Sequence, residues 1–243
     1  MGFNLNGMLM IDTLKRILGF IILLLFILWN INCLGQDSLK LSDRTHNIAG
    51  FVTAETDQIN GLALGVWNQP EINHGQRING VELELLGAGW VTPFLFLDDG
   101  GYIPKSRNML RNNGLIFGTT LLAGKINGVG LSPFVITHHD LNGLIAAPVT
   151  VTLYNANGIT IGVINYVAVL NGLQLGVYNN TRQVSGLEAG IYNKCDDHSV
   201  GLQIGLINRS NEHKGIQIGL VNIIGKRITP VINWSFRPFS DAG

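Results

Sequence analysis

Two short stretches of the chain carry the residue types that ligate metals or act as nucleophiles. His138, His139 and Asp140 are consecutive, and Cys195 is followed by two aspartates and then His198. A structural zinc site usually needs four such ligands, and adjacent side chains on extended backbone point to opposite faces. A nucleophilic cysteine needs a base that the fold brings beside it. We therefore predict two solvated turns, with no catalytic residue and no metal site.

Glu82 and Glu84 form a pair of carboxylates two positions apart. On one strand face they would lie about 7 Å apart, and glycosidases use carboxylate pairs. An exposed or lumen-facing polar row explains the pair more simply. The 31 glycines among 243 residues do not indicate a phosphate-binding loop, because that motif needs a helix after its strand. No helical periodicity appears after residue 35, so the sequence predicts no enzyme and no cofactor.

Many of the glycines belong to a short repeated phrase. Its clearest copies begin at Gly172, Gly186, Gly201 and Gly215. Each reads glycine, aliphatic, Gln or Glu, aliphatic or small, glycine, two bulky apolar residues and asparagine. Other copies, some of them degenerate, extend upstream to Gly61. The stride is nearly constant, at about 14 to 15 residues, and a fixed period of this kind indicates a repeat architecture.

Aliphatic and polar or small side chains alternate within the phrase, which is the period of a β-strand. The links between phrases have the composition of turns. We therefore predict an all-β chain with one strand of about eight residues in each repeat. In an antiparallel meander, about ten such strands would close toward a β-barrel. In the alternative, a parallel β-solenoid, each repeat is one coil and equivalent residues stack in ladders.

Two observations separate these architectures. The asparagine that ends each phrase favours the solenoid, because only stacking gives every repeat the same neighbour. The links favour the meander, because a coil is expected to need apolar residues on both walls and the link 209–214 has none. We predict the meander, with the solenoid as the alternative. The aliphatic face would then lie against a core or, in a small outer-membrane pore, against lipid.

The N-terminus has the layout of a cleaved export signal. Lys15 and Arg16 precede an apolar run at 17–29, and small residues precede Gln36. The run is shorter than the about 20 residues that a membrane-spanning helix needs. We predict a signal peptide at 1–35 and a single all-β repeat domain at 36–243, with repeats at about 59–87 and 114–234 and an insert at 88–113.

Charge and cysteine content exclude some classes of protein. The chain has 16 Lys and Arg and 16 Asp and Glu, and this balance gives no indication of a nucleic-acid partner or an anionic surface. Charged residues make up 13% of the chain, against about 25% in ordinary soluble domains. Cys195 alone remains after removal of the signal, so we expect no internal disulfide.

The phrase from Gly201 to Asn208, repeated at this stride, resembles the surface-repeat proteins of spirochaetes and Bacteroidetes. The similarity covers roughly 59–234, and Ile228–Trp234 is similar to the Pro-containing, aromatic end of those arrays. The resemblance implies export and a surface or envelope location. It implies no assigned activity and no catalytic residues.

We therefore predict an exported protein of the outer membrane or cell surface, with a periplasmic or secreted soluble protein as the alternative. Its role would be structural or binding, with envelope components or a glycan as partners. Amide and carboxylate side chains flanked by aromatic rings would suit a polar ligand. The residues of this candidate ligand face are Trp67, Gln174, Tyr178, Glu188, Tyr192, Gln203 and Gln217.

Overall fold

The computed structural model describes residues 45–52, 56–66, 75–85 and 110–239. Within these ranges the ordered elements are strands, and no helix is long and apolar enough to cross a membrane. The predicted signal peptide, Trp67 and residues 88–109 of the insert lie outside them. The strands are β1 (Thr45–His46), β2 (Ala49–Phe51), β3 (Gln58–Gly65), β4 (Arg77–Glu84), β5 (Arg111–Gly118), β6 (Thr120–Leu131), β7 (Val135–Ala146), β8 (Val149–Ile161), β9 (Ile164–Leu175), β10 (Tyr178–Ala189), β11 (Tyr192–Ile204), β12 (Ile207–Ile224) and β13 (Arg227–Ser235).

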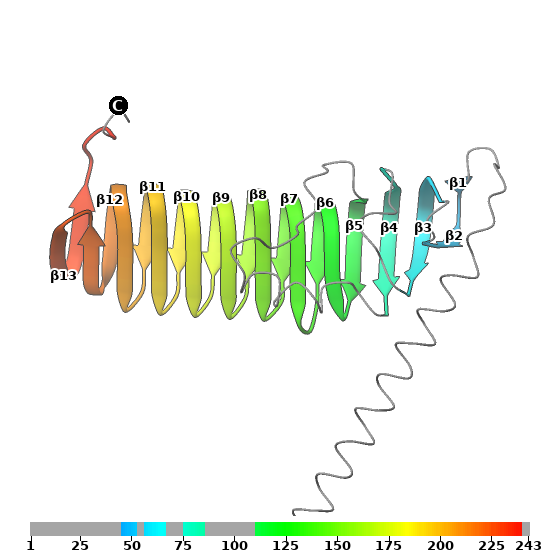
Figure 1. The fold of residues 1–243 in the computed structure, drawn as a ribbon, viewed down its shortest axis with the longest axis horizontal. Helices are drawn as coiled ribbons and strands as arrows, with labels where there is room; N and C mark the ends of the chain where they lie inside the picture. Colours follow the sequence, from blue (N-terminus) through cyan, green and yellow to red (C-terminus); the bar gives the residue numbers. More distant parts are fainter. Residues whose placement is uncertain (1–44, 53–55, 67–74, 86–109, 240–243) are drawn as a thin grey trace, which may run out of the picture. The chain divides into compact units, whose positions relative to one another are not determined.

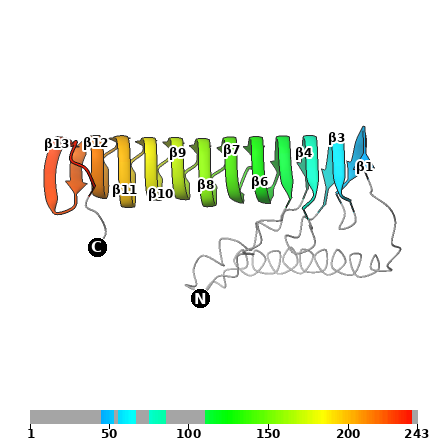
Figure 2. The same ribbon diagram turned by 90° about the horizontal axis from the view of Figure 1, so that it is seen from above.

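Strands that are neighbours in the sequence are neighbours in the sheet. From β3 to β12 every adjacent pair is parallel, and β13 alone runs antiparallel to its neighbour. Figures 1 and 2 show the coils side by side in one row, in chain order. The all-β prediction and the solenoid alternative are thus confirmed. The meander closing toward a barrel is wrong, and the outer-membrane pore built on that barrel loses its structural basis.

Each repeat is one coil, and its strand runs along two walls. In β10, residues 178–181 form the first wall and residues 184–189 form the second, with a polar corner between them. Parallel pairing places each residue beside its counterpart in the next coil, so that Glu188 lies beside Gln203. The predicted phrase therefore spans a second wall, a corner and the start of the next coil. The polar links are walls and corners, and not hairpin turns.

The corner absorbs the small variation in the stride of the repeat. Thr181 of β10 pairs with Cys195 of β11, and Val184 pairs with Ser199. The second pair is offset by one more residue than the first, so β11 has one extra residue between the two pairs. The extra residue forms a bulge at the corner. The glycines and asparagines of the walls therefore stay in register although the stride varies.

One glycine in each second wall allows the coils to stack closely. A Cβ atom on Gly186 would lie 1.9 Å from the carbonyl oxygen of Gly172 in the preceding coil. The φ angle of Gly186 is 146°, which side chains of L-residues rarely permit. Both constraints hold along the stack. The ladder glycines are Gly61, Gly80, Gly114, Gly128, Gly143, Gly158, Gly172, Gly186, Gly201 and Gly215.

The interior of the coils changes character along the stack. From β6 to β7 it is mostly aliphatic, and each of the following residues is 0% exposed: Leu121, Ile126, Ile136, Leu141 and Ile145. From β9 to β12 it is mostly polar, and these residues are also 0% exposed: Asn165, Gln174, Asn179, Glu188, Asn193, Gln203, Asn208 and Gln217. β8 is mixed, since Thr150 and Thr160 lie in the interior beside Ala156.

The aliphatic side chains of the phrase point outward and not toward a core, the first of the two orientations that the sequence left open. They stand one and three places after each ladder glycine, from β3 to β12, and we call these two columns the apolar wall. Ile204, Ile216 and Ile218 are each 40% exposed. The residue between the two columns points inward, and in β9 to β12 that residue is Gln or Glu. A polar interior is stable here because stacking gives the interior asparagines, and the amides of Gln203 and Gln217, partners in neighbouring coils.

Both ends of the described stack are closed by atypical elements. β1 and β2 form an N-terminal coil that the repeat pattern did not reveal, and Asn60 Nδ2 donates to Asn47 Oδ1 across it at 3.1 Å. At the other end, β13 folds back on β12. Val231 has a φ of 66° in this strand, and Asn233, 2% exposed, covers the last amides of the interior.

Candidate functional site

The residues of the predicted ligand face do not form one outward surface. Gln174, Glu188, Gln203 and Gln217 are 0% exposed inside the coils. Tyr178 and Tyr192 lie on the outside of the first wall, where their rings stack at a centroid distance of 5.5 Å and an interplanar angle of 2°. The predicted face is divided because the Gln or Glu of each phrase points into the coil, whereas the tyrosine points outward. A glycan cannot reach these amides from solvent.

The interior amides form a hydrogen-bonded chain that runs along the stack. Gln217 Nε2 donates to Gln203 Oε1 at 2.7 Å, and Gln203 Nε2 donates to Glu188 Oε2 at 2.6 Å. The hydroxyl of Thr181 lies 2.8 Å from Glu188 Oε1 and 2.9 Å from Gln174 Oε1. This hydroxyl has one proton and cannot donate to both oxygens. Two arrangements complete the chain. Glu188 is protonated and donates to Thr181, which donates to Gln174, or the Gln174 amide is turned over so that its Nε2 donates to Thr181 and Thr181 donates to Glu188.

The electrostatics of Glu188 favour the first arrangement, in which its carboxyl is protonated. Burial raises the pKa of Glu188 to about 7, although hydrogen bonds from Gln203 and Thr181 act in the opposite direction. Desolvation disfavours the charged form of a carboxyl group. Glu188 therefore belongs to the structural interior, where its neutral form resembles the glutamines of the adjacent coils.

A second interior ladder consists of asparagines. Asn179 Nδ2 donates to Asn193 Oδ1 at 2.7 Å, and Asn193 Nδ2 donates to Asn208 Oδ1 at 2.7 Å. Each amide also donates to a backbone carbonyl at the corner, as Asn193 does to Ile204 at 2.8 Å. The stacking that the repeated asparagine indicated is thus confirmed. Its function is to satisfy the polar groups of the corner.

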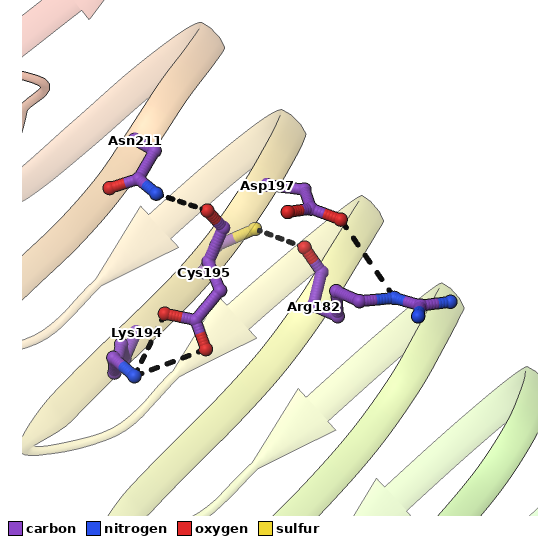
Figure 3. A network of polar contacts seen from close by, with 6 residues as sticks. Arg182, Lys194, Cys195, Asp197 and Asn211 are labelled. Atoms are coloured by element: carbon purple, nitrogen blue, oxygen red, sulfur yellow. Dashed lines mark hydrogen bonds and ion pairs between the residues drawn. The ribbon is translucent and has the colours of Figure 1, made fainter.

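Cys195 and Asp197 lie at a corner of β11, as Figure 3 shows, and His198 follows them in the same strand. Cys195 is buried, which corrects the prediction of a fully solvated turn, and its Sγ lies 3.3 Å from the carbonyl oxygen of Arg182. Burial raises the pKa of the Cys195 thiol, so the thiolate, the nucleophilic form, is disfavoured. Lys194 Nζ contacts Asp196 Oδ1 at 2.8 Å, and Asp197 Oδ2 lies 3.8 Å from Arg182 Nε. The carboxylates of this corner are therefore engaged in solvent-accessible ion pairs.

His138 and His139 are not in a solvated turn, which corrects that prediction. They lie in β7 and are 0% and 2% exposed. His138 Nε2 is 3.0 Å from Thr152 Oγ1, and the ring of His139 meets Tyr154 edge-on at 5.3 Å. Burial lowers the pKa of His138 to about 3, so the ring is neutral. Among the described residues no group of three His, Cys, Asp or Glu side chains is placed to hold a metal ion.

Glu82 and Glu84 are also buried, at 0% and 4% exposure, so the exposed form of the predicted row is wrong and the two side chains face inward. Asn112 Nδ2 donates to Glu82 Oε2. Burial raises the pKa of Glu82 to about 8, which the bond from Asn112 partly offsets. The pair faces the interior of the N-terminal coils, so it belongs to the core.

A groove of about 360 Å³ lies on the outside of the N-terminal coils. Three cations line it, Arg77, Arg111 and Lys125, and these occupy equivalent positions of β4, β5 and β6. Parallel coils place equivalent residues about 4.8 Å apart. We call the groove lined by these three cations and by Asn79, Asn113 and Asn127 the basic groove.

The second column of the basic groove is a ladder of carboxamides. Asn79 Nδ2 donates to Asn60 Oδ1 at 2.7 Å, and Asn113 Nδ2 donates to Asn79 Oδ1 at 2.7 Å. Asn127 Nδ2 continues the ladder to Asn113 Oδ1 at 2.6 Å. Each ladder bond uses one of the two N–H groups of an amide. The other N–H group can donate to a ligand in the groove.

Gln58 and Asp140 stand at the ends of the cation column. Gln58 Nε2 donates to Asn60 Oδ1 at 2.8 Å, and Asp140 is beside Lys125 in the next coil. None of the ion pairs between described side chains involves Arg77, Arg111 or Lys125. Like charges at about 4 Å repel by about 1 kcal/mol even in bulk water. An anion lying along the column would replace this repulsion with attraction.

The balanced net charge concealed the basic groove. The column of cations becomes visible in the sequence when the repeats are aligned on the ladder glycines. Each of its members stands three places before a ladder glycine: Arg77, Arg111 and Lys125. Comparison with protein-family models, with curated proteins and with solved structures found no match. Geometry and chemistry alone therefore support the functional proposal.

Proposed function

We propose that the protein is an exported binding module of a bacterial envelope whose basic groove holds an acidic polysaccharide. The β-solenoid is consistent with a structural or binding role. The observation that supports the ligand is the column of Arg77, Arg111 and Lys125 beside a ladder of amides. Guanidinium groups bind carboxylates in a bidentate manner, and carboxamides exchange hydrogen bonds with sugar hydroxyls.

The repeating geometry favours a polymer over a small anion. Successive cations about 4.8 Å apart match a ligand whose charges also repeat along a line. Single-stranded nucleic acid is also a linear polyanion, but its binding sites combine cations with aromatic platforms for the bases. The lining residues of the basic groove include no aromatic side chain. An acidic glycan is therefore the ligand that we propose.

The cellular location is part of the proposal. The pattern of Lys15, Arg16 and the apolar run at 17–29 supports export, and the resemblance to bacterial surface-repeat proteins supports the outer membrane or cell surface. A periplasmic or secreted soluble protein is the alternative. Catalysis is not part of the proposal.

Titration with polygalacturonate, a polymer of uronic acids, tests the groove. We expect saturable binding that weakens between about 50 and 200 mM salt, because screening reduces exposed charge interactions. Arg111→Gln should weaken binding by about 10- to 100-fold, since a hydrogen bond to a charged group contributes about 1.5–3 kcal/mol. Arg209→Gln removes the same charge from an exposed position on the first wall of a distant coil and should leave binding unchanged.

Three results would overturn the proposal. Equal losses for Arg111→Gln and Arg209→Gln would show attraction by overall charge only. Equal affinity for neutral dextran would show that the cations are irrelevant. A single-stranded DNA oligonucleotide that displaces polygalacturonate at lower concentration would identify nucleic acid as the better ligand.

A further inference from the structure

The apolar wall is a continuous hydrophobic surface on the outside of the solenoid. Its two columns run from β3 to β12 and contain no polar or charged side chain. The corner beside it adds Val177, Ile191 and Leu206, which are 45%, 51% and 50% exposed. Monomeric proteins rarely expose contiguous apolar patches larger than a few hundred Å². We propose that the apolar wall is the interface of a homodimer, in which the walls of two copies pack face to face.

The area of the wall fits a stable dimer. Inter-coil steps of about 4.8 Å from β3 to β12 make it roughly 43 Å long, and the two columns with the corner make it roughly 15 Å wide. One copy would then bury on the order of 650 Å², or about 1,300 Å² in total, and stable interfaces bury about 1,200–2,000 Å². A smaller partner would leave much of the wall in water.

The regularity of the wall favours a second copy over a lipid surface. In-register coils place the side chains of each column at a constant spacing. A second wall has the same spacing, so its ridges fit the grooves of the first, as in dry interfaces between stacked sheets. A two-fold axis makes such a flat surface complementary to itself. Lipid tails would cover the wall without requiring this spacing.

Light scattering on the purified full chain measures the proposed dimer. We expect twice the mass of one chain at micromolar concentration. Leu187→Glu with Leu202→Glu places two charges in the wall and should raise the dimer dissociation constant by at least about 100-fold, because buried unpaired charges are costly. Asn180→Glu with Arg209→Glu changes outward positions of the opposite wall. This control pair should remain dimeric.

A milder pair, Leu187→Thr with Leu202→Thr, keeps the test valid if the glutamates prevent folding, and circular dichroism verifies the fold of each variant. A monomeric wild type would overturn the inference, as would a dimer that both wall variants leave intact. Flotation with phosphatidylcholine vesicles provides the third outcome. A monomeric wild type that floats with the vesicles, when the double glutamate variant does not float, would assign the wall to lipid and would also overturn the dimer.

Discussion

The coils with an aliphatic interior, β6 and β7, and the coils with an amide interior, β9 to β12, have the same backbone arrangement. The strand register shows how a polar side chain replaces an aliphatic one at the same position of successive coils. Ile136 pairs with Thr150, and Thr150 pairs with Asn165. A second column changes from Ile145 through Thr160 to Gln174. The backbone ladder and the ladder glycines are unchanged across this boundary.

This comparison separates what sets the fold from what fills it. The coil is defined by parallel hydrogen bonding and by glycines that allow close stacking. The interior needs only to be filled and to have its polar groups paired. Repetition supplies that pairing in the asparagine ladder, where each amide meets an identical amide in the next coil at 2.7–2.8 Å. The two interiors should therefore respond alike to changes in the backbone and differently to changes in side chains.

The largest effect is expected for the ladder glycines, in both regions equally. A Cβ on Gly143 would lie 2.0 Å from the carbonyl oxygen of Gly128, and one on Gly186 would lie 1.9 Å from that of Gly172. Gly143→Ala and Gly186→Ala should each lower the free energy of unfolding by more than about 4 kcal/mol, as measured by urea denaturation.

Gly130→Ala is the matched control for the glycine variants. The Cβ of this variant would meet only side chains, the nearest being Ile145 Cγ2 at 3.2 Å, and a loss of about 1 kcal/mol or less is expected. A similarly small loss for Gly143→Ala would show that the close stacking of the coils is not essential.

Side-chain truncation should cost less and should distinguish the two interiors. Leu141 is 0% exposed, and Leu141→Ala should lose about 2–5 kcal/mol through the cavity that it leaves. Leu141→Met should restore most of that loss. Asn193→Ala should lose about 2–4 kcal/mol, because Asn179, Asn208 and the carbonyl of Ile204 lose partners. Asn193→Leu should be no better than Asn193→Ala. If leucine restores stability at 193, the ladder contributes only volume.

The repeat and the all-β class could be predicted from the sequence, because alternation and the recurring glycines are local signals. The direction of the strand faces could not. An aliphatic column is usually assigned to the core, and the link 209–214 has no aliphatic or aromatic side chain to point inward. In the structure Ser210 and His213 are the inward residues of that link, at 1% and 3% exposure. Side chains of this kind become interior groups only when the stacked coils enclose them.

The basic groove could not be predicted for a related reason. Its cations belong to three separate segments of the chain, and only the parallel register makes them neighbours. The step from Arg77 to Arg111 spans the insertion before β5, which conceals the column in any fixed-period comparison. His138 and His139 were misplaced because the bulge between His138 and Asp140 buries two adjacent residues that a regular strand would orient to opposite faces.

An effect that depends on pH and is specific to the amide interior concerns the proton of Glu188. Its pKa is about 7 in the folded chain, against 4.5 for a glutamate in water, as in the unfolded chain. Between these values the folded state holds a proton that the unfolded state releases, so stability falls as the pH rises through this window. The total loss is on the order of 3 kcal/mol, since one pKa unit corresponds to about 1.4 kcal/mol.

Glu188→Gln should remove this dependence, because an amide in this column pairs as Gln203 and Gln217 do and does not ionise. Urea denaturation at pH 4.5 and pH 8 measures the difference between the variant and the wild type. We expect little or no difference at pH 4.5 and a more stable variant at pH 8. Glu82, whose pKa is about 8, contributes the same pH dependence to the stability of both proteins. The difference in stability between variant and wild type therefore reports on Glu188 alone.

Asp197→Asn is the control for this experiment, because it changes an accessible carboxylate in the same way. It should alter stability by less than about 1 kcal/mol at either pH. Parallel pH curves for the wild type and Glu188→Gln would mean that Glu188 is ionised in the folded chain. The proton that we assign to Glu188 would then be absent, and the amide interior would hold a buried charge that the aliphatic interior of β6 and β7 does not.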